Sequence, residues 1–531
     1  MDAKTPSEDI KPSSGAARPL QGRPPAGPGG GPPSGGHPGM RGKRNLTEGP
    51  ITRTLLVFSL PVLGGNALQS LNLTANQIWV SHTLGVQGVT ALGNSNQVMM
   101  LMLGSIFGVS MAANILVAQS VGAGNFAQVK KVMGSATTFF FVLASILALT
   151  GGILAPHILS LMDTPMEARA GAIAYLRIAF SAVPFMYFFA FMQMAQRGAG
   201  DSTTPFWFML LAVALDVVLN PLLILGIGPF PRLGVAGSAT STLIGQGVSL
   251  VFLIAHLYRK NSILLLRPGE FHLLKPDFDI MRSLITRGIP MGIQMFVMSG
   301  AGIVMLFLVN QYGAITSAAY SMSSMIWSYL QMPTMALGAS ISSMAAQNVG
   351  AGRWDRVARI ARSGVISSLV VSASLATVLY IFNDQVLSLL LRSDSPALAE
   401  AHHINILSLW GFVIFSITFA LSGVVRSTGV VWVPLLILAT SMIAVRIPFA
   451  IALKPYLGED AIWWSFPMGT ITSASLTALY YRLGNWRKSR MLHSQPYGQA
   501  ADSGSSTPAM DPPEEDAEAA EVMAASKRPA A

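Results

Sequence analysis

The sequence is poor in charged residues and contains no cysteine. Asp, Glu, Lys and Arg make up only 11% of the 531 residues, less than half of the ~25% that is typical of soluble proteins. The absence of cysteine excludes disulfides, iron–sulfur clusters and thiol catalysis. Mean hydropathy is +0.51, and repeated apolar stretches reach the roughly 20 residues that a membrane-spanning helix needs. The composition therefore predicts an all-α polytopic membrane protein whose solvent is the lipid bilayer.

Motifs for enzyme chemistry are also missing. No Walker loop is present, so we expect no direct use of ATP. His402 and His403 follow Glu400 but lack the spacing of metal ligands. We therefore expect no enzymatic activity and no cofactor. The formal net charge of +10 would suggest a nucleic-acid partner in a soluble protein. In a membrane protein it indicates basic cytoplasmic loops, so no nucleic-acid partner is expected.

Both ends of the sequence have compositions that do not support a folded core. Residues 1–50 are rich in proline and glycine, and residues 491–531 are polar with an acidic run near the end. Such segments bury too little apolar surface to fold, and we predict two disordered tails. The first segment also lacks the apolar core of a cleavable signal peptide, so the first membrane helix is expected to act as the insertion signal. The acidic run is either an inert solvated tail or a docking segment.

Twelve apolar stretches between the tails predict twelve transmembrane helices. Their approximate starts are Thr54, Val89, Val132, Ala172, Pro205, Gly234, Met281, Ala318, Ile360, Ile404, Val431 and Ala461. A longer polar stretch separates the sixth from the seventh. The predicted organisation is a first six-helix lobe at 51–258, a cytoplasmic linker at 259–280 and a second six-helix lobe at 281–490.

Loop charges predict the orientation. Lys and Arg concentrate in alternate loops, such as those containing Lys130 and Lys131 or Arg353 and Arg356, while the opposite loops contain few basic residues. Basic loops remain in the cytoplasm, which places both termini there. An even number of helices also requires both termini to lie on one side.

An internal repeat relates the two halves. Residues 118–129 recur as residues 346–357 at an offset of 228, and Pro61 and Pro205 match Pro290 and Pro434 at an offset of 229. Because six helices return the chain to the same side, the lobes should be related by a pseudo-twofold axis along the membrane normal, with a central substrate cavity between them. Two fused lobes favour a transporter over a channel, and we expect a monomer that interacts with the lipid bilayer.

Several motifs resemble those of the multidrug and toxic compound extrusion (MATE) transporters. They are Gln119–Gly124, Gln347–Gly352, Arg197–Pro205, Leu233–Gly237 and Val445–Pro448. The resemblance covers roughly residues 47–487. It implies a secondary-active antiporter in a bacterial inner membrane, which exports small organic compounds, mostly cationic or amphipathic, by alternating access. The driving force would be inward movement of H⁺ or Na⁺.

One acid, Asp216, lies deep in an apolar stretch. A charge there costs roughly 2.5 to 3.5 kcal/mol on insertion scales, which indicates either a proton or cation site or a neutral, hydrogen-bonded structural acid. Asn220 lies four residues further and on the same helix face. Pro221 lacks an N–H and frees a backbone carbonyl one turn earlier. Since burial disfavours the charged form of a carboxyl group, one such group is sufficient to take up and release a proton.

The resemblance adds Asn76 and Thr242 to this cation site and also shows departures from the family pattern. The helix 1 position is usually an acid but is Asn76 here, and the usual order of Asn and Asp on helix 5 is reversed. Acids found in the second lobe of some subgroups are replaced by Met298 and Val430. Coupling should therefore depend on Asp216. The choice between H⁺ and Na⁺ stays open.

Five other polar residues are candidates for the substrate cavity, with interhelical hydrogen bonding as the alternative role. They are Gln69, Asn72, Gln294, Tyr320 and Arg446. Arg446 would contact an anionic substrate group, pair with a loop acid, or extend toward the outer interface as a structural residue.

Two other functions compete with drug efflux. A flippase for lipid-linked precursors would need several cationic side chains in the cavity, and Arg446 alone is a candidate. A membrane sensor or scaffold would use the tails as docking segments.

Overall fold

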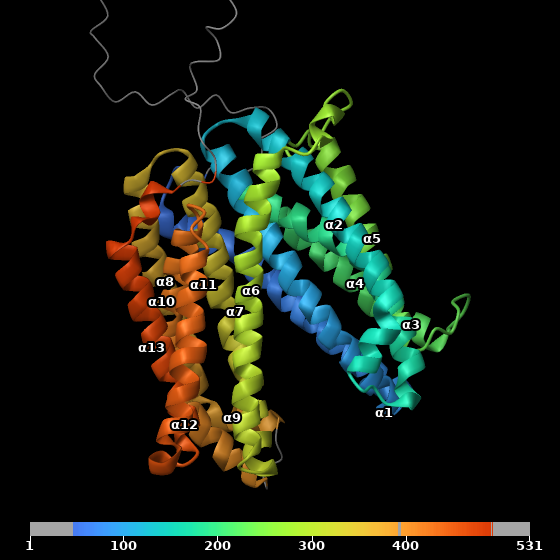
Figure 1. Ribbon diagram of the computed structural model, residues 1–531, viewed down its shortest axis with the longest axis vertical. Coiled ribbons are helices and arrows are strands. Elements are labelled where there is room, and N and C mark those ends of the chain that lie inside the picture. Colours follow the sequence, from blue (N-terminus) through green and yellow to red (C-terminus); the bar gives the residue numbers. More distant parts are fainter. Residues whose placement is uncertain (1–45, 391–394, 490, 492–531) are drawn as a thin grey trace, which may run out of the picture.

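The computed structural model describes residues 46–390, 395–489 and 491, and the regular elements in this part are helices (Figure 1). The first two spans form one continuous element, α1 (Ile51–Gly122), which breaks at Gly85, where φ is 61° and ψ is −155°. The first lobe continues with α2 (Phe126–Leu161), α3 (Met166–Gly198), α4 (Thr203–Leu225) and α5 (Val235–Arg259).

The second lobe repeats this plan after the short helix η2 (Phe271–Leu274). Its spans are α6 (Phe278–Asn310), α7 (Ala314–Gly350), α8 (Trp354–Ile381), α10 (Pro396–Arg426), α11 (Trp432–Ala439) with α12 (Arg446–Leu457), and α13 (Asp460–Leu483). A π-helix, η3 (Thr440–Val445), joins α11 to α12. The short helices α9 (Asn383–Leu390) and η4 (Asn485–Lys488) complete the lobe.

The prediction of twelve membrane helices in two lobes is confirmed, with each predicted start inside an observed helix or one residue before it. Nine helical segments of the described part are long and apolar enough to cross a membrane by composition. They are α1, which contains two of the twelve spans, α2 to α6, α8, α10, and α11 to α12 taken together; α7 and α13 are less apolar. Each lobe has its own aromatic core. Phe140 and Phe191 stack at 4.7 Å in the first lobe, and Trp327 and Phe466 stack at 5.8 Å in the second.

The two lobes meet at one end of the molecule and diverge toward the other (Figure 1). At the meeting end, Gly122 packs against the carbonyl oxygen of Gln347, and Gly350 packs against that of Gln119. A Cβ atom added at either glycine would lie 1.8 Å and 2.0 Å, respectively, from these oxygens. No side chain fits there, which explains glycine in both copies of the repeated motif.

The repeated glutamines make crossed hydrogen bonds at this end. Gln119 Nε2 donates to the carbonyl oxygen of Ser427 at 2.6 Å, and Gln347 Nε2 donates to that of Gly198 at 2.8 Å. The two donors, Gln119 and Gln347, are 228 residues apart, and the two acceptors, Gly198 and Ser427, are 229 apart, as in the sequence repeat. Each lobe therefore binds the other through equivalent groups, as a twofold interface requires. We call this set of contacts the inter-lobe closure.

The segment before α1 is bound to the second lobe. Arg353 Nη1 donates to the carbonyl oxygen of Thr47 at 2.7 Å, and Arg356 Nη2 donates to that of Glu48 at 2.8 Å. Leu46 is fully buried. These residues fall within the tail expected at 1–50, so its ordered part begins earlier than composition indicated. The remainder of both expected tails, 1–45 and 492–531, lies outside the described residues.

The linker before α6 is bound to the first lobe in a corresponding way, but through ion pairs. Lys130 pairs with Glu270, and Lys131 pairs with Asp277 at 2.6 Å. The hydrogen bond from Lys130 lowers the pKa of Glu270, and that from Lys131 lowers the pKa of Asp277. The start of each lobe is thus held by the opposite lobe.

Candidate cation site

The helix α4 places Asp216 near the middle of a 23-residue apolar segment, where the side chain is 2% exposed. Its carboxyl group faces α1 and α5. Gly245 of α5 allows this packing, because an added Cβ would lie 2.8 Å from the carbonyl oxygen of Ala212 on α4. The close approach brings the hydroxyl-bearing face of α5 to the carboxyl group.

Four side chains donate hydrogen bonds to Asp216. Asn72 Nδ2 and Thr242 Oγ1 lie 2.8 Å and 3.0 Å from Oδ2, and Asn76 Nδ2 lies 3.4 Å from the same oxygen. Ser241 Oγ donates to Oδ1. The donors come from α1 and α5, so this one carboxyl group connects three helices. Hydrogen bonds of this kind satisfy the oxygen atoms of a buried carboxyl group and offset part of the cost of burial.

Asn220 extends the cluster by one turn. Its Nδ2 donates to Asn76 Oδ1 and lies 3.3 Å from Ser238 Oγ. The amide oxygens of Asn72 and Asn220 are buried and have no hydrogen-bond partner. Among the described residues, no basic side chain lies within ion-pair distance of Asp216. The cluster therefore offers a carboxylate and two available amide oxygens without a positive charge to balance them.

All four residues predicted for the cation site come together in the structure, namely Asp216, Asn220, Asn76 and Thr242. Asn72 also belongs here, although we placed it among the substrate-cavity candidates. Its spacing of four residues from Asn76 was a usable signal, because such pairs share a helix face. Ser241 and Ser238 were missed. Serine is common in membrane helices, and nothing in the α5 sequence distinguishes these two hydroxyl groups from their neighbours.

The other substrate-cavity candidates do not gather around Asp216. Gln69 is exposed on α1, and Gln294 Oε1 accepts a hydrogen bond from Arg426 Nη1 at 3.2 Å. Tyr320 and Arg446 lie together in the second lobe. Arg446 is only 7% exposed and, within the described residues, has no carboxylate at ion-pair distance. Its side chain is therefore buried and pairs with no described loop acid. Contact with an anionic substrate group and a structural role stay as the two interpretations.

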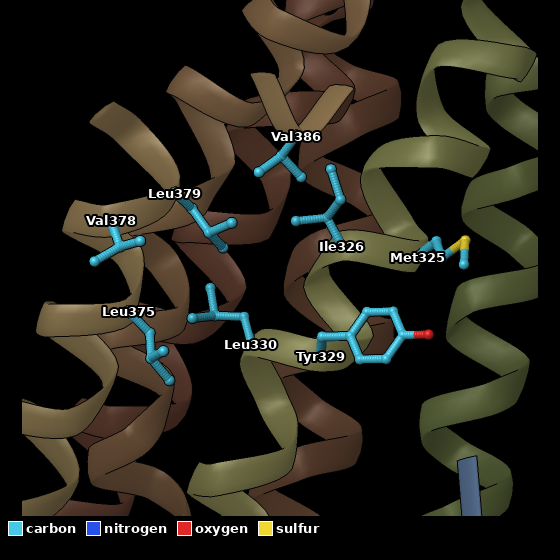
Figure 2. Close-up of a pocket in the computed structure, with 8 residues that line it drawn as sticks. All are labelled: Met325, Ile326, Tyr329, Leu330, Leu375, Val378, Leu379 and Val386. Atoms are coloured by element: carbon cyan, nitrogen blue, oxygen red, sulfur yellow. The ribbon is translucent and has the colours of Figure 1, made fainter. Parts of the chain in front are cut away.

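Two pockets lie in the second lobe, away from Asp216. One of about 310 Å³ is lined by apolar side chains of α7, α8 and α9, with Tyr329 contributing the hydroxyl group seen in Figure 2. It has no charged group to orient a polar ligand. A second pocket of about 220 Å³ lies between α6, α12 and α13, and its lining includes Tyr312, Ala450 and Lys454.

Comparison with known proteins gives consistent matches. The MatE family model matches residues 61–222 and 290–452, one range in each lobe. The chain is 32% identical to the probable multidrug resistance protein YoeA of Bacillus subtilis, over 83% of this chain and 95% of that protein. It is 24% identical to the probable multidrug resistance protein NorM of Thermotoga maritima, over 83% and 94% of the two chains. A solved outward-facing multidrug resistance transporter of the MATE family superposes with a TM-score of 0.76 at 20% identity, covering 82% of this chain and 96% of that one.

Proposed function

Because the chain belongs to the MatE family, a family of multi-pass membrane transporters, we propose that it is a secondary-active antiporter that exports organic cations and amphipathic compounds in exchange for H⁺ or Na⁺. Relatives named as multidrug resistance proteins support the substrate class. The observation that carries the proposal is the Asp216 cluster. A carboxyl group in the middle of a membrane helix has four donors and no basic partner in the described part of the chain.

The oxygen atoms of the cluster fit both coupling ions. A proton needs only the Asp216 carboxylate. Na⁺, a hard cation, needs several oxygen ligands. The carboxylate and the unpartnered amide oxygens of Asn72 and Asn220 provide them. Either ion would remove the uncompensated negative charge, whose burial in a membrane costs several kcal/mol.

Ion binding at this cluster would change how α1 is held. Asp216 Oδ2 accepts hydrogen bonds from Asn72 and Asn76, both on α1. A proton on Oδ2 converts an acceptor into a donor, so at least one amide loses its partner. Weaker attachment then allows α1 to bend between Pro61 and Gly85, where the helix already contains a proline and a break. We propose that this bending expels the bound compound.

The orientation follows from the basic loops. The inter-lobe closure lies at the end of the molecule that carries Lys130, Lys131, Arg353 and Arg356, so we assign this end to the cytoplasm, with both termini. The diverging end would then face the outside of a bacterial inner membrane, and the protein would act as a monomer.

The test uses Asp216→Asn in liposomes that contain the purified full chain. Export of a cationic dye should fall to the background rate, and movement of H⁺ or Na⁺ driven by the dye should disappear. Asp201→Asn is the matched control, because Asp201 caps the start of α4 and asparagine also caps helices. The ion that moves with the dye in the wild type identifies the coupling ion. Wild-type coupling in the Asp216→Asn variant would refute the proposal.

The two competing functions give different results in the same system. A flippase would move labelled lipid precursors, and a sensor or scaffold would lose its function when residues 1–45 and 492–531 are deleted. Full dye export by that deletion variant would support the transporter.

A further inference from the structure

We infer that the second lobe contains an anion-binding site centred on Arg446, which takes the carboxylate of a zwitterionic or anionic aromatic compound. The inference rests on the proposed export function and specifies a class of substrate for it. Two ionisable residues are buried in the middle of membrane helices, Asp216 in the first lobe and Arg446 in the second.

The two residues occupy equivalent positions in the repeat. The prolines near the starts of α4 and α11, Pro205 and Pro434, are 229 residues apart, whereas Asp216 and Arg446 are 230 apart. The π-helix Thr440–Val445 lies between Pro434 and Arg446 and accounts for one additional residue. Single π-turns inside α-helices are frequent at functional sites. Each lobe therefore has one buried charge at the same depth, and the two charges have opposite signs.

Aromatic side chains hold Arg446 but do not neutralise it. The guanidinium carbon lies 5.1 Å from the centre of the Phe466 ring, and the Tyr320 hydroxyl lies beside the guanidinium. Phe466 is itself fixed between Trp327 at 5.8 Å and Phe412 at 4.4 Å. Cation–π contacts of this kind stabilise a desolvated cation without removing its charge.

The counter-ion of Arg446 is missing within the described residues. Its Nε atom is buried without a hydrogen-bond partner, and no carboxylate lies within 4.0 Å. Asp216 is the corresponding case of opposite sign, because a mobile cation would balance its buried negative charge. A buried charge without a counter-ion in a membrane marks a functional site by default. For Arg446 the missing group is an anion.

Three other arginines are buried, but their surroundings differ from those of Arg446. Arg356 donates to the carbonyl oxygens of Glu48 and Gly49. The Nε atoms of Arg197 and Arg426 also lack a hydrogen-bond partner, but both residues lie in the last turns of α3 and α10, where the helix dipole places partial negative charge. Arg426 also donates to Gln294. Arg446 lies in the middle of the span formed by α11, η3 and α12, away from any such helix end.

A line of groups leads from the end of α12 to Arg446. Arg446, Ala450 and Lys454 are four residues apart and lie along one face of α12. Ala450 and Lys454 line the pocket of about 220 Å³, next to Tyr312. Lys454 Nζ lies 5.1 Å from the centre of the Tyr312 ring. This face therefore presents one cation, Lys454, in the lining of the cavity and a second, Arg446, about two turns away along α12.

The guanidinium favours an organic carboxylate over a simple halide. Its planar array of donors matches the two oxygens of a carboxylate and binds them as a pair. A chloride ion has no such geometry. Competition between the two kinds of anion can therefore identify the ligand class.

The test compares two dyes of nearly equal size on the purified full chain. Rhodamine B carries a carboxylate and is a zwitterion, whereas its ethyl ester is a cation. Binding is measured by fluorescence polarisation for the wild type, Arg446→Gln, Arg446→Lys and the control Arg177→Gln, an exposed arginine on α3. We expect Arg446→Gln to lower the affinity for rhodamine B about tenfold, because one charge-assisted contact is lost. The affinity for the ester should fall by less than about twofold. Arg446→Lys should give an intermediate loss, and the control none.

Competition on the wild type provides a second measurement that needs no variant to fold. Sodium benzoate should displace rhodamine B at lower concentration than sodium chloride, which also serves as the ionic-strength control. Displacement by chloride and benzoate at equal concentration would overturn the carboxylate assignment. Equal weakening of both dyes in a monodisperse Arg446→Gln variant would show a structural role, and unchanged binding of both would also overturn the inference.

Failure of this inference can be separated from failure of the proposed function. The dye measurements report binding and do not require transport. Asp216-dependent export of the cationic ester would leave the proposed function intact even if Arg446 had no effect on either dye.

Discussion

The two lobes share their helix plan but differ at the centre of equivalent helices. The first lobe has Asp216 with four polar donors, and the second has Arg446 among aromatic rings. At the inter-lobe closure the opposite holds, because Gln119 and Gln347 make the same contacts in both directions. The duplication has kept its symmetry where the lobes contact each other and has lost it where each lobe contains a buried charge of its own.

A physical reason accounts for this pattern. At a twofold interface, a change in one copy of a residue alters the contact that the other copy depends on. The carbonyl oxygen of Gln119 packs on Gly350, and that of Gln347 packs on Gly122. By contrast, the hydrogen bonds to Asp216 and the ring contact of Arg446 in the described part of the chain come from side chains of the same lobe. These interior positions were free to diverge after duplication.

The largest effect is expected from Gly122→Ala and Gly350→Ala. The added methyl group would lie within 2.0 Å of a backbone oxygen, so the lobes must separate. Overpacking costs about 1–3 kcal/mol, and we expect dye export to fall about tenfold or more in both variants. Uptake of the dye by inverted vesicles measures the effect. Gly302→Ala on α6 is the control, since nothing lies within 4 Å of its added Cβ.

This pair of variants also tests the symmetry of the closure. Normal export by one glycine variant together with loss in the other would show that the lobes do not depend on each other equally.

A smaller effect is expected from Gln119→Ala and Gln347→Ala. Each removes one hydrogen bond across the closure, worth about 1 kcal/mol, so the open population at this end should rise about fivefold. The chain has no native cysteine, so Ser343→Cys provides a single reporter at a buried site that contacts Asn114 across the lobes. Its rate of labelling by a soluble maleimide measures the opening.

The comparison between the two glutamines is informative in itself. Gln119 Oε1 also accepts the backbone N–H of Met491 at 3.2 Å, a contact for which Gln347 has no counterpart among the described residues. Gln119→Ala should therefore give slightly faster labelling than Gln347→Ala. Equal rates in both variants and the parent would contradict a role for the crossed bonds.

The sequence alone predicted the elements that depend on local composition. Apolar runs located the twelve spans, and a single acid within one of them identified Asp216. The spacing of four residues then added Asn220. Asn76 and Thr242 came from the family resemblance, and all four meet in the structure.

Features set by long-range contacts were not predictable. The carbonyl groups of Thr47 and Glu48 lie in a segment whose composition indicates disorder, yet arginines about 300 residues away bind them. For Arg446 the sequence left three roles open, because a helical pattern reveals neither the π-turn before it nor its contact with the Phe466 ring. Ser241 was missed because the rotation of α5 relative to α4 decides which hydroxyl group reaches Asp216.

The smallest effect concerns the segments that hold the start of each lobe. The pKa values of Glu270 and Asp277 are lowered by Lys130 and Lys131. Groups with a lowered pKa stabilise the folded state above the ordinary value of about 4 and lose that contribution as the pH falls through the lowered value. The arginine contacts to Thr47 and Glu48 use carbonyl acceptors, which do not titrate.

Acidification should therefore loosen one segment more than the other. Between pH 5 and pH 3, hydrogen exchange corrected for the intrinsic rate should increase about two- to threefold in the linker before α6, since exposed pairs contribute about 0.5 kcal/mol each. It should increase less in residues 46–49, which are held by hydrogen bonds to carbonyl groups and where the Glu48 carboxylate interacts with Arg356 electrostatically. Lys130→Met with Lys131→Met should produce the same increase at pH 7. Arg359→Met is the control, because its pair with Asp355 lies within α8 and joins no separate segments. An equal increase in hydrogen exchange in both segments would show that the ion pairs do not hold the linker before α6. Both segments would then be attached to the opposite lobe in the same way.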